Sequence, residues 1–418
     1  MNIWLIKEGE PLPCDESPRL MRMGLLAEYL CKNNNDVIWW TSTFEHGKKK
    51  QRFTQDTDIV CFEKCNLKLL HAKTVYKKNT SIKRIIYHKQ LAKAFLKNAA
   101  HEEKPNIIFC SYPTIDFAVA AIKYGKKNDV PVVLDVRDLW PDIFERVIPK
   151  PLRFLKKLFL FPFNRKARFA LSNATCITSI NDSHLNWALV KAGRSKNEYD
   201  ISAYLGYKQT ILSESDINAQ KDFWDRLGIT KETWNICYFG TMSKMTLDME
   251  TVIKGFDKLN SRYPHARLIL CGDGDSLEYF KSLSPNTNII YPGWVNKNQI
   301  TYLMSISKLG LYHFHNLPDF INSFTNKIIE YLSGGLPVIT SLKGFSKDYL
   351  LNNSVGVYYE EKNTNSFVEE VDKLLKDDPL RAEMSKKAVE IYTRELTSEK
   401  TNEKIYEMFK KILNRGEK

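Results

Sequence analysis

The sequence contains no apolar run long enough to cross a membrane as a helix. No stretch approaches about 18 consecutive apolar residues, the length at which a helix can begin to span the hydrocarbon core. The opening residues MNIWLIKEGE also lack the basic start and extended apolar segment of a signal peptide. We therefore expect a cytoplasmic protein.

Cysteine pairs with the spacing of metal ligands or redox centres are also missing. Of the 8 cysteines only Cys61 and Cys65 lie close in sequence, and no CxxC pair or Cys/His cluster occurs. Several cysteines, such as Cys110 and Cys237, fall inside apolar runs, where a free thiol acts as a small hydrophobic group. A reducing compartment is expected.

The sequence has neither of the common glycine-rich nucleotide motifs. GxGxxG and GxxxxGK[ST] are both absent, so neither a dinucleotide fingerprint nor a P-loop is supported. The histidines number only 8 and form no Ser/His/Asp or Cys/His arrangement that would indicate a nucleophilic hydrolase.

Charge and hydrophobic content are plentiful. The 418 residues include 62 Lys+Arg against 49 Asp+Glu, a net charge of +13, and 43% are hydrophobic. This length suits two domains with substantial cores. The basic excess favours nucleic acid, an anionic membrane surface or phosphate-bearing substrates as partners.

Strand-like and helix-like segments alternate along the chain. Apolar runs such as MNIWLI, NIIFCSY and VPVVLDV are separated by amphipathic helical patterns, the rhythm of a doubly wound parallel sheet. Residues 196–233 are polar and irregular, and a second alternating series follows. We predict two Rossmann-like domains, 1–205 and 206–395, facing a central cleft, with a terminal helix at 396–418 packing back on the first domain.

The stretch NKIIEYLSGGLPVITS, residues 326–341, places a glutamate in an apolar helix. Its pattern predicts a helix over 326–333, ended by glycines and followed by a strand. Glu330 is therefore either a helix-end charge without function or a ligand for a polar group at the sheet edge.

Two glycine-containing turns follow strands in the same half. In YFGTMSK, Gly240 would let the backbone approach a ligand and Lys244 could reach phosphate oxygens, although a plain turn with a solvated lysine also fits. In CGDGD, Asp273 and Asp275 match an Asp-x-Asp metal motif, but turn chemistry alone explains them. No metal is expected.

Two charged segments mark the first half. In LDVRDLWPD a strand ends in Asp135, Arg137 and Asp138, which suit chemistry or acceptor binding at the sheet edge, or an ion pair bracing the loop. Residues 146–169 hold eight Lys/Arg and no acid among Phe and Leu. This segment fits an element lying on anionic lipid, nucleic acid binding, or a solvated helix with core phenylalanines; no nucleic-acid signature accompanies it.

Taken together, these motifs resemble retaining glycosyltransferases of family 4 with the GT-B fold, in the branch that builds bacterial O-antigen and capsule. The resemblance covers nearly the whole chain, and its residues are PRLMRMGLLAEYL, DVIWWTSTFEH, KKKQR, VRDLWPD, FGTMSK, LDMETVI and NKIIEYLSGGLPVI. It implies an acceptor-binding first domain and a nucleotide-sugar-binding second domain.

The resemblance also assigns roles at matching positions. Glu330 matches the second glutamate of the family's Glu-x7-Glu motif, which contacts the donor ribose, whereas the first falls on Asn322, with Asp319 as a substitute. Asp138, Lys244 and Asn322 are the candidate catalytic residues. The donor site is expected to comprise Gly240, Thr241, Lys244, Gly272, Val295, Asn322, Thr325, Asn326, Lys327 and Glu330, with backbone amides at 325–327 on the diphosphate. Acceptor and membrane contacts fall to Arg137, Lys156, Lys157, Arg165 and Lys166, with Phe159, Leu160 and Phe161 entering the lipid interface.

The implied activity is that of a hexosyltransferase-type enzyme without metal or cofactor. It would move a HexNAc or deoxy-HexNAc from a UDP-sugar to a polyprenyl-diphosphate-linked saccharide in lipopolysaccharide O-antigen or capsule synthesis, as a peripheral protein on the inner face of the cytoplasmic membrane that binds no nucleic acid. Two alternatives stay open: a nucleotide-sugar 2-epimerase of the same fold, and a non-catalytic membrane- or nucleic-acid-binding scaffold.

Overall fold

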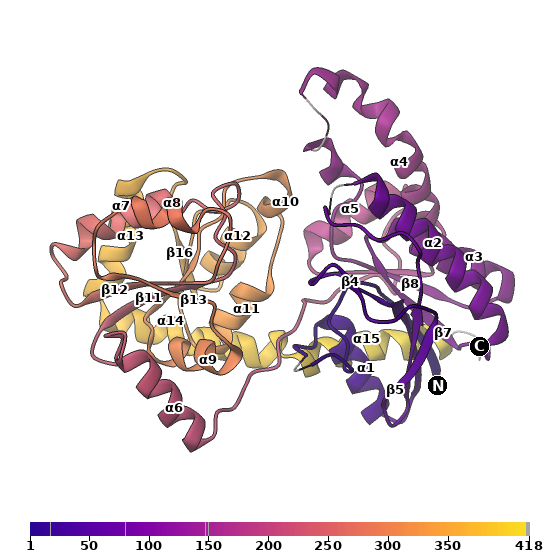
Figure 1. Ribbon diagram of the computed structural model, residues 1–418, viewed down its shortest axis with the longest axis horizontal. Coiled ribbons are helices and arrows are strands. Elements are labelled where there is room, and N and C mark those ends of the chain that lie inside the picture. The colour runs from indigo at the N-terminus through magenta and orange to yellow at the C-terminus, as the bar shows by residue number, and fades with distance from the viewer. Residues whose placement is uncertain (17, 80, 147, 149, 415–418) are drawn as a thin grey trace. The chain divides into compact units, whose positions relative to one another are not determined.

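The protein folds into two compact units. In this computed structural model the described residues are 1–16, 18–79, 81–146, 148 and 150–414 (Figure 1). Unit 1 comprises Met1–Leu205 with Ser398–Lys418, and unit 2 comprises Gly206–Thr397. The chain thus enters unit 2 after residue 205 and returns to unit 1 at residue 398.

Unit 1 is built on an eight-stranded sheet with the order β10-β9-β8-β7-β1-β2-β6-β5. Every neighbouring pair is parallel except β5 with β6. The strands are β1 (Asn2–Ile6), β2 (Asp36–Ser42), β5 (Thr57–Phe62), β6 (Cys65–Leu70), β7 (Ile107–Tyr112), β8 (Val132–Val136), β9 (Cys176–Ser179) and β10 (Ile201–Ser202), and a separate hairpin pairs β3 (Phe44–Glu45) with β4 (Lys50–Gln51). Continuous apolar strands of this kind are typical of sheets covered on both faces.

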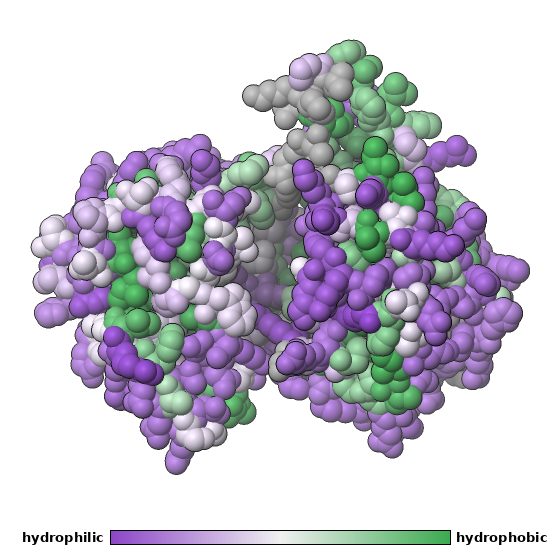
Figure 2. Space-filling view, in the orientation of Figure 1, coloured by the Kyte–Doolittle hydropathy of each residue, from purple (hydrophilic) through white to green (hydrophobic). Residues whose placement is uncertain are grey.

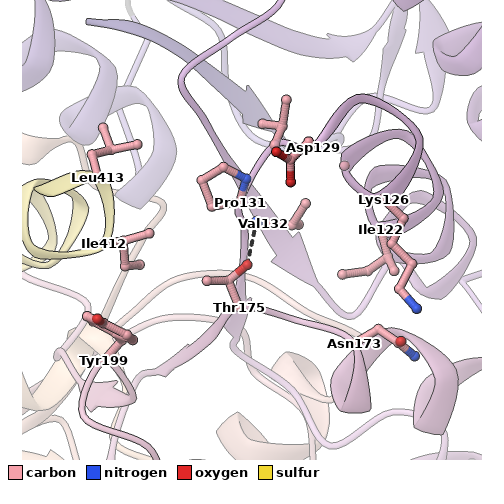
Figure 3. Close-up of a pocket in the computed structure, with 12 residues that line it drawn as sticks. Ile122, Lys126, Asp129, Pro131, Val132, Asn173, Thr175, Tyr199, Ile412 and Leu413 are labelled. Atoms are coloured by element: carbon pink, nitrogen blue, oxygen red, sulfur yellow. Dashed lines mark hydrogen bonds between the residues drawn. The ribbon is translucent and has the colours of Figure 1, made fainter. Parts of the chain in front are cut away.

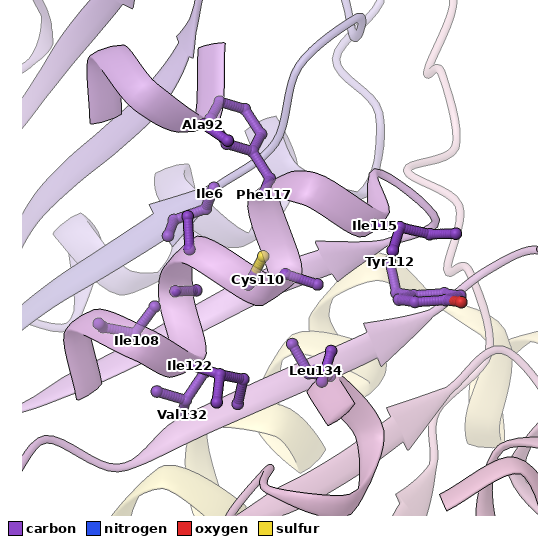
Figure 4. Close-up of a cluster of buried hydrophobic side chains, with 14 of the residues drawn as sticks. Ile6, Ala92, Ile108, Cys110, Tyr112, Ile115, Phe117, Ile122, Val132 and Leu134 are labelled. Atoms are coloured by element: carbon purple, nitrogen blue, oxygen red, sulfur yellow. The ribbon is translucent and has the colours of Figure 1, made fainter. Parts of the chain in front are cut away.

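Helices cover both faces of this sheet. They are α1 (Arg22–Lys32), α2 (Ile82–Asn98), α3 (Ile115–Asn128), α4 (Lys156–Ser172), α5 (Asp182–Ala192) and α15 (Ser398–Leu413), with short 3₁₀ turns at Ala99–His101, Asp142–Arg146 and Lys150–Leu155. In β1, Trp4 and Ile6 belong to a cluster with residues of α2 and α3 on one face. Figure 4 shows Ile6 in this cluster with Ala92 of α2 and Phe117 of α3. Ile3 and Leu5 pack with α1 and α15 on the other. This period of two is the pattern of a doubly wound sheet.

Unit 2 is built on a six-stranded parallel sheet with the order β13-β12-β11-β14-β15-β16. Its strands are β11 (Trp234–Phe239), β12 (Ala266–Cys271), β13 (Ile289–Gly293), β14 (Leu309–Tyr312), β15 (Val338–Thr340) and β16 (Gly356–Tyr358). Its helices are α6 (Glu214–Asp225), α7 (Met249–Asn260), α8 (Leu277–Ser282), α9 (Lys297–Ile306), α10 (Pro318–Ile321), α11 (Asn326–Ser333), α12 (Phe345–Asn352), α13 (Thr364–Lys376) and α14 (Asp378–Ile391), followed by a π-helical turn at Tyr392–Leu396. The prediction of two Rossmann-like parallel-sheet domains is confirmed.

The polar segment 196–233 contains the boundary between the two units, between Leu205 and Gly206, and also contains α6. Ser213 caps this helix by accepting a hydrogen bond from the backbone N–H of Asp216, whose carboxylate in turn accepts one from the backbone N–H of Ser213. This capping box supplies a helix start that polar composition alone conceals.

Candidate functional site

Three glycine-containing turns meet where β11, β12 and β13 end in unit 2. The backbone N–H of Gly240 donates to the carbonyl of Cys271 at 2.9 Å, and that of Gly272 donates to the carbonyl of Gly293 at 2.7 Å. Gly272 has a φ of 133°, and a Cβ there would lie 1.9 Å from the Gly240 oxygen. Because a side chain at Gly272 would clash with Gly240, glycine lets the two backbones approach at the edge where parallel sheets bind ligands.

Lys327 places its side chain at this edge. Its ammonium donates a hydrogen bond to the backbone carbonyl of Phe239 and lies 4.4 Å from the centre of the Tyr238 ring. A Cβ added to Gly240 would lie 2.7 Å from the same nitrogen. The sequence predicted only a backbone role for Lys327 in donor binding, so its side-chain cation was missed. The available signal was a lysine in the first turn of the predicted helix 326–333.

Lys244, the predicted catalytic and diphosphate-binding lysine, lies in a different environment. It is exposed, with its ammonium 5.1 Å from the centre of the Tyr279 ring. It lines a pocket of about 700 Å³ that also includes Glu250, His315 and Glu361. His315 pairs with Glu361 at 2.7 Å. This pocket is therefore lined by both cationic and anionic side chains, next to the turn after β11.

Glu330 is 4% exposed in the middle of α11. Its neighbours Ile328, Ile329, Tyr331 and Leu332 are all fully buried, so it is the one charged residue in the buried part of this helix. A carboxylate is retained at such burial only when polar groups stabilise it. Its position on α11 puts it in the same helix as Lys327.

The remaining predicted donor residues lie on the loops around α11 and after β13. Asn322 follows the short helix α10, and Thr325 stands at the start of α11 without a side-chain capping bond to the Asn326 turn. Val295 is buried after β13, and its neighbour Trp294 is 79% exposed. Thr241 is exposed, and its carbonyl accepts from the Tyr238 hydroxyl at 3.0 Å. The side chain of Asp319 lies outside the described part of the structure.

His313 is a buried residue that the sequence analysis did not assign to the site. It is 0% exposed, and among the described residues neither ring nitrogen has a hydrogen-bond partner. Its ring meets that of Tyr238 edge-on at 4.9 Å. Burial, together with the charge of Lys327, lowers the pKa of His313 to about 3. A neutral imidazole thus lies beside the Lys327 cation.

The Asp-x-Asp sequence forms a turn. Asp273 accepts from the backbone N–H of Gly274 at 2.7 Å, and Asp275 accepts from the Ser276 hydroxyl at 2.8 Å. Each carboxylate therefore bonds its sequence neighbour, as turn residues commonly do.

In unit 1, Asp138 follows β8 and remains solvent-exposed. Partial desolvation by the surrounding protein raises its pKa, while the charges of Lys7, Arg137 and Arg84 act in the opposite direction. An exposed carboxyl with a raised pKa beside cations at a sheet edge is a reasonable acid–base group.

Arg137, predicted to contact the acceptor, belongs to a buried ion-pair network. It pairs with Glu10 and, at 2.7 Å, with Asp135, which also pairs with Arg22 at 2.8 Å. Burial by itself would raise the pKa of Asp135, but the two guanidinium groups hold it well below its ordinary value. The Arg137 Nη2 atom is buried and has no partner within the described residues. The contacts observed for Arg137 therefore brace the loop after β8.

A second buried carboxylate, Glu8, lies after β1, and its contacts were missed by sequence reasoning. Glu8 is 3.4 Å from His88 Nε2 and accepts from the Thr114 hydroxyl at 3.1 Å. Burial would raise the pKa of Glu8, but His88, Lys7 and Arg84 hold it well below its usual range. No sequence signal connects these residues, because they come from three segments about 25 to 100 residues apart.

Among its described residues, the basic segment contains cations that form ion pairs and cations for which no ion pair is found. Lys156 pairs with Glu145 at 2.9 Å and Lys166 with Asp116 at 2.6 Å. Lys157 and Arg165 are exposed. Among the apolar residues, Phe159 and Phe161 are exposed, but Leu160 is only 5% exposed. The prediction that Leu160 enters a lipid interface was wrong, since it faces the protein interior.

A separate pocket of about 580 Å³ lies at the opposite edge of the unit 1 sheet (Figure 3). It is lined by Pro131 and Val132 where β8 begins and by Thr175 before β9, with α15 alongside. The Thr175 hydroxyl oxygen accepts from the Val132 N–H at 3.1 Å. Because this pocket lies at the amino ends of the strands, it is not at the edge where doubly wound sheets bind ligands.

Parts of the chain are similar in sequence to known proteins. Residues 220–391 match the family model for glycosyl transferases group 1. N-acetyl-alpha-D-glucosaminyl L-malate synthase of Bacillus anthracis is 22% identical over 244 residues, 57% of this chain and 60% of that protein. No helix among the described residues is long and apolar enough to cross a membrane.

Solved structures share the whole fold. Sucrose-phosphate synthase of Thermosynechococcus elongatus superposes with a TM-score of 0.73 at 14% identity, covering 99% of both chains. HepE of Anabaena, solved in complex with UDP, has a TM-score of 0.67 at 14% identity over 98% of this chain and 100% of its own. The solved structures confirm the GT-B fold, and the family match of residues 220–391 agrees with the predicted class of glycosyltransferase.

Proposed function

We propose that the protein is a retaining glycosyltransferase that takes a sugar from a UDP-sugar. The observation that carries this proposal is the side chain of Lys327 over the bare glycine turn at Gly240, in the same helix as the buried Glu330. A diphosphate can approach this turn closely, and a cation beside it would stabilise the negative charge of the leaving group.

The helix α11 supplies the rest of the donor site. Its first backbone N–H groups, at Asn326 and Lys327, have no intrahelical acceptor by helix geometry, and the helix dipole favours an anion there. Glu330 would accept hydrogen bonds from the two ribose hydroxyls, which are stronger than neutral bonds because the acceptor is charged. The exposed Trp294 offers an apolar surface next to Val295, the expected contact with the base.

The proposed sugar is a HexNAc or a deoxy-HexNAc. The matching relative of Bacillus anthracis is named N-acetyl-alpha-D-glucosaminyl L-malate synthase, which supports a HexNAc, and HepE was solved with UDP, which supports a UDP-linked donor. Asn322 stands where related enzymes carry a glutamate, and an amide there would donate as well as accept hydrogen bonds to sugar hydroxyls.

The proposed acceptor is a saccharide on a polyprenyl diphosphate in O-antigen or capsule synthesis, reached from the membrane surface. Phe154, Leu158 and Phe161 are 78%, 69% and 63% exposed. They lie with the exposed cations Lys157 and Arg165 on and before α4, where Figure 2 shows apolar side chains gathered at the surface. Such a surface suits an anionic membrane interface.

A donor screen tests the function. Purified protein would be incubated with UDP-, dTDP- and GDP-sugars, and the release of nucleoside diphosphate would be measured with and without EDTA. We expect turnover of a UDP-HexNAc that resists EDTA and a rise in thermal stability with UDP. The absence of any UDP-dependent thermal shift would favour a scaffold, while conversion of the donor to its 2-epimer without transfer would favour the epimerase.

A further inference from the structure

Unit 1 contains a cluster of cationic and aromatic side chains that the proposed catalytic groups do not use. It is formed by the turn between β3 and β4, the residues before α2 and the first turn of α2. We name it the Lys49–Arg84 cluster, and its members are His46, Lys49, Tyr76, Asn79 and Arg84.

Both cations lie against the same aromatic ring. The Lys49 ammonium is 5.1 Å from the centre of the Tyr76 ring, and the Arg84 guanidinium is 5.5 Å from it. Arg84 is also 4.8 Å from the centre of the Trp140 ring. Lys49 donates to the Asn79 side-chain oxygen at 2.7 Å, and Arg84 donates to the Asn79 carbonyl at 3.1 Å. Two positive charges are thus held together by neutral partners.

The buried carboxylate of Glu8 acts electrostatically on Lys49 and Arg84 but forms no ion pair with either in the described part of the chain. Within the described part of the chain, neither Lys49 nor Arg84 forms an ion pair, and the buried Arg84 Nε has no hydrogen-bond partner. Glu8, an acid near the cluster, already contacts His88 and Thr114. Burial and the charge of Arg84 lower the pKa of Lys49. Holding like charges this close is unfavourable unless an anion joins them.

Local backbone geometry keeps Lys49 in this position. Its φ is 55°, a left-handed conformation that is uncommon outside glycine, asparagine and aspartate. Nδ1 of the neighbouring His46 ring forms a hydrogen bond with the Tyr76 hydroxyl at 2.6 Å. The Lys49 ammonium lies 3.3 Å from the same nitrogen. Backbone strain that aims a cation is a feature of binding sites.

The cluster lies at the sheet edge used for chemistry. A Cβ added to Gly9, in the loop after β1, would be 3.4 Å from the Cβ of His46. Asp138 follows β8 at the same carboxyl edge, and the charge of Arg84 acts on it. The amino-terminal end of α2, a helix of 17 residues, adds its dipole to the same region.

We propose that the Lys49–Arg84 cluster binds the diphosphate of a lipid-linked acceptor. This inference rests on the proposed function. It assigns the diphosphate of the acceptor to unit 1, whereas the diphosphate of the donor is assigned to unit 2. Lys49 binds one phosphate as a point charge, and Arg84 binds through its unpartnered Nε and its remaining N–H groups. Tyr76 lies against both cations and Trp140 lies against Arg84, which limits the access of water to them.

The test measures binding of farnesyl diphosphate and of inorganic pyrophosphate by calorimetry, with saturating UDP present to fill the donor site. The variants are Lys49→Met, Arg84→Gln and the double change. Lys83→Gln, which removes an exposed positive charge from the adjacent position on α2, is the matched control. UDP binding of every variant is measured separately, so a failure of the donor site is distinguished from a failure of this cluster.

We expect farnesyl diphosphate to bind the parent protein and to lose about tenfold or more in affinity with each single variant, as loss of one charge-assisted hydrogen bond implies. Lys83→Gln and UDP binding should change little. Three results would overturn the proposal: no binding of farnesyl diphosphate to the parent, an equal loss in the control, or pyrophosphate binding as tightly as farnesyl diphosphate, which would indicate a site for a free anion. If the double variant does not fold, the single variants decide.

Discussion

The ammonium group of Lys327 donates a hydrogen bond to the backbone carbonyl of Phe239, the last residue of β11. This contact joins the first turn of α11 to the strand end at which the sheet of unit 2 opens toward Gly240. It places a positive charge beside Gly240, and it makes Lys327 rather than the exposed Lys244 the cation at the strand end.

The Lys327→Met variant should bind UDP more weakly than the parent. Removal of a hydrogen bond to a charged group costs about 1.5–3 kcal/mol, roughly a tenfold to hundredfold rise in Kd. Lys244→Met should have a smaller effect, and Lys281→Met, at an exposed position on α8, should have none. Isothermal titration of the three variants with UDP gives the ranking. A larger loss in Lys244→Met would reassign the diphosphate to the pocket near His315.

Gly272→Ala should destabilise the protein. The new Cβ would lie 1.9 Å from the Gly240 oxygen, and its φ of 133° is unfavourable for alanine. Overpacking typically costs about 1–3 kcal/mol, and backbone strain adds to it. Gly47→Ala, where nothing lies within 4 Å of the added Cβ, is the control. Urea unfolding measures both. If the two variants were equally stable, the turns at Gly240 and Gly272 would have to move apart to accommodate the new Cβ.

The buried ion pair of Arg22 and Asp135 makes stability depend on pH. The folded-state pKa of Asp135 is held below its ordinary value, so its contribution is present above the unfolded pKa of about 3.9 and is lost as pH falls through the folded pKa. Asp135→Asn should cost about 3–5 kcal/mol at pH 7, because it leaves buried guanidinium groups uncompensated. The difference between parent and variant should shrink below about pH 4. Urea titrations at pH 7 and pH 3 compare them, and a constant difference would contradict the assignment.

The membrane role of α4 can be tested with charge-matched variants. Lys157→Gln with Arg165→Gln removes two exposed cations, whereas Lys156→Gln with Lys166→Gln removes two that already pair with Glu145 and Asp116. If the surface binds anionic lipid, the first pair should lose about 2 kcal/mol of binding, at about 1 kcal/mol per basic residue. The second pair should lose less.

Sedimentation with vesicles of phosphatidylglycerol at low and high salt provides the measurement for α4. Binding should weaken at high salt because exposed charges are screened. Equal loss in the two double variants would show that net charge alone governs attachment. A parent protein that ignores these vesicles at low salt would remove the membrane role altogether.

The sequence predicted the sheet architecture because buried parallel strands are continuous apolar runs. MNIWLI and VPVVLDV correspond to β1 and β8, and the helix expected over 326–333 coincides with α11. Amphipathic spacing and the glycines after Ser333 give that helix a strong local signal. Polar α6 lacked such a signal, since its start depends on the capping bonds of Ser213.

The site was less predictable than the fold. Gly240 and Glu330 could be named from local pattern and family resemblance, but the direction of the Lys327 side chain depends on how α11 packs on β11. The pairing of Glu8 with His88 depends on contacts across 80 residues of chain. Tertiary packing decides such contacts, and a single sequence carries no local trace of them.

The most direct test of the donor site is UDP binding by Glu330→Gln in the presence of EDTA. The parent should bind UDP without metal, because Lys327 and the amino end of α11 would neutralise the diphosphate. Glu330→Gln should keep its melting temperature within a few degrees and bind UDP about tenfold to hundredfold more weakly, the loss expected for charged hydrogen bonds to ribose. Glu369→Gln, at an exposed position on α13, should bind like the parent. If Glu330→Gln binds UDP as tightly as the parent, or if EDTA abolishes binding and manganese restores it, the account of this site is wrong.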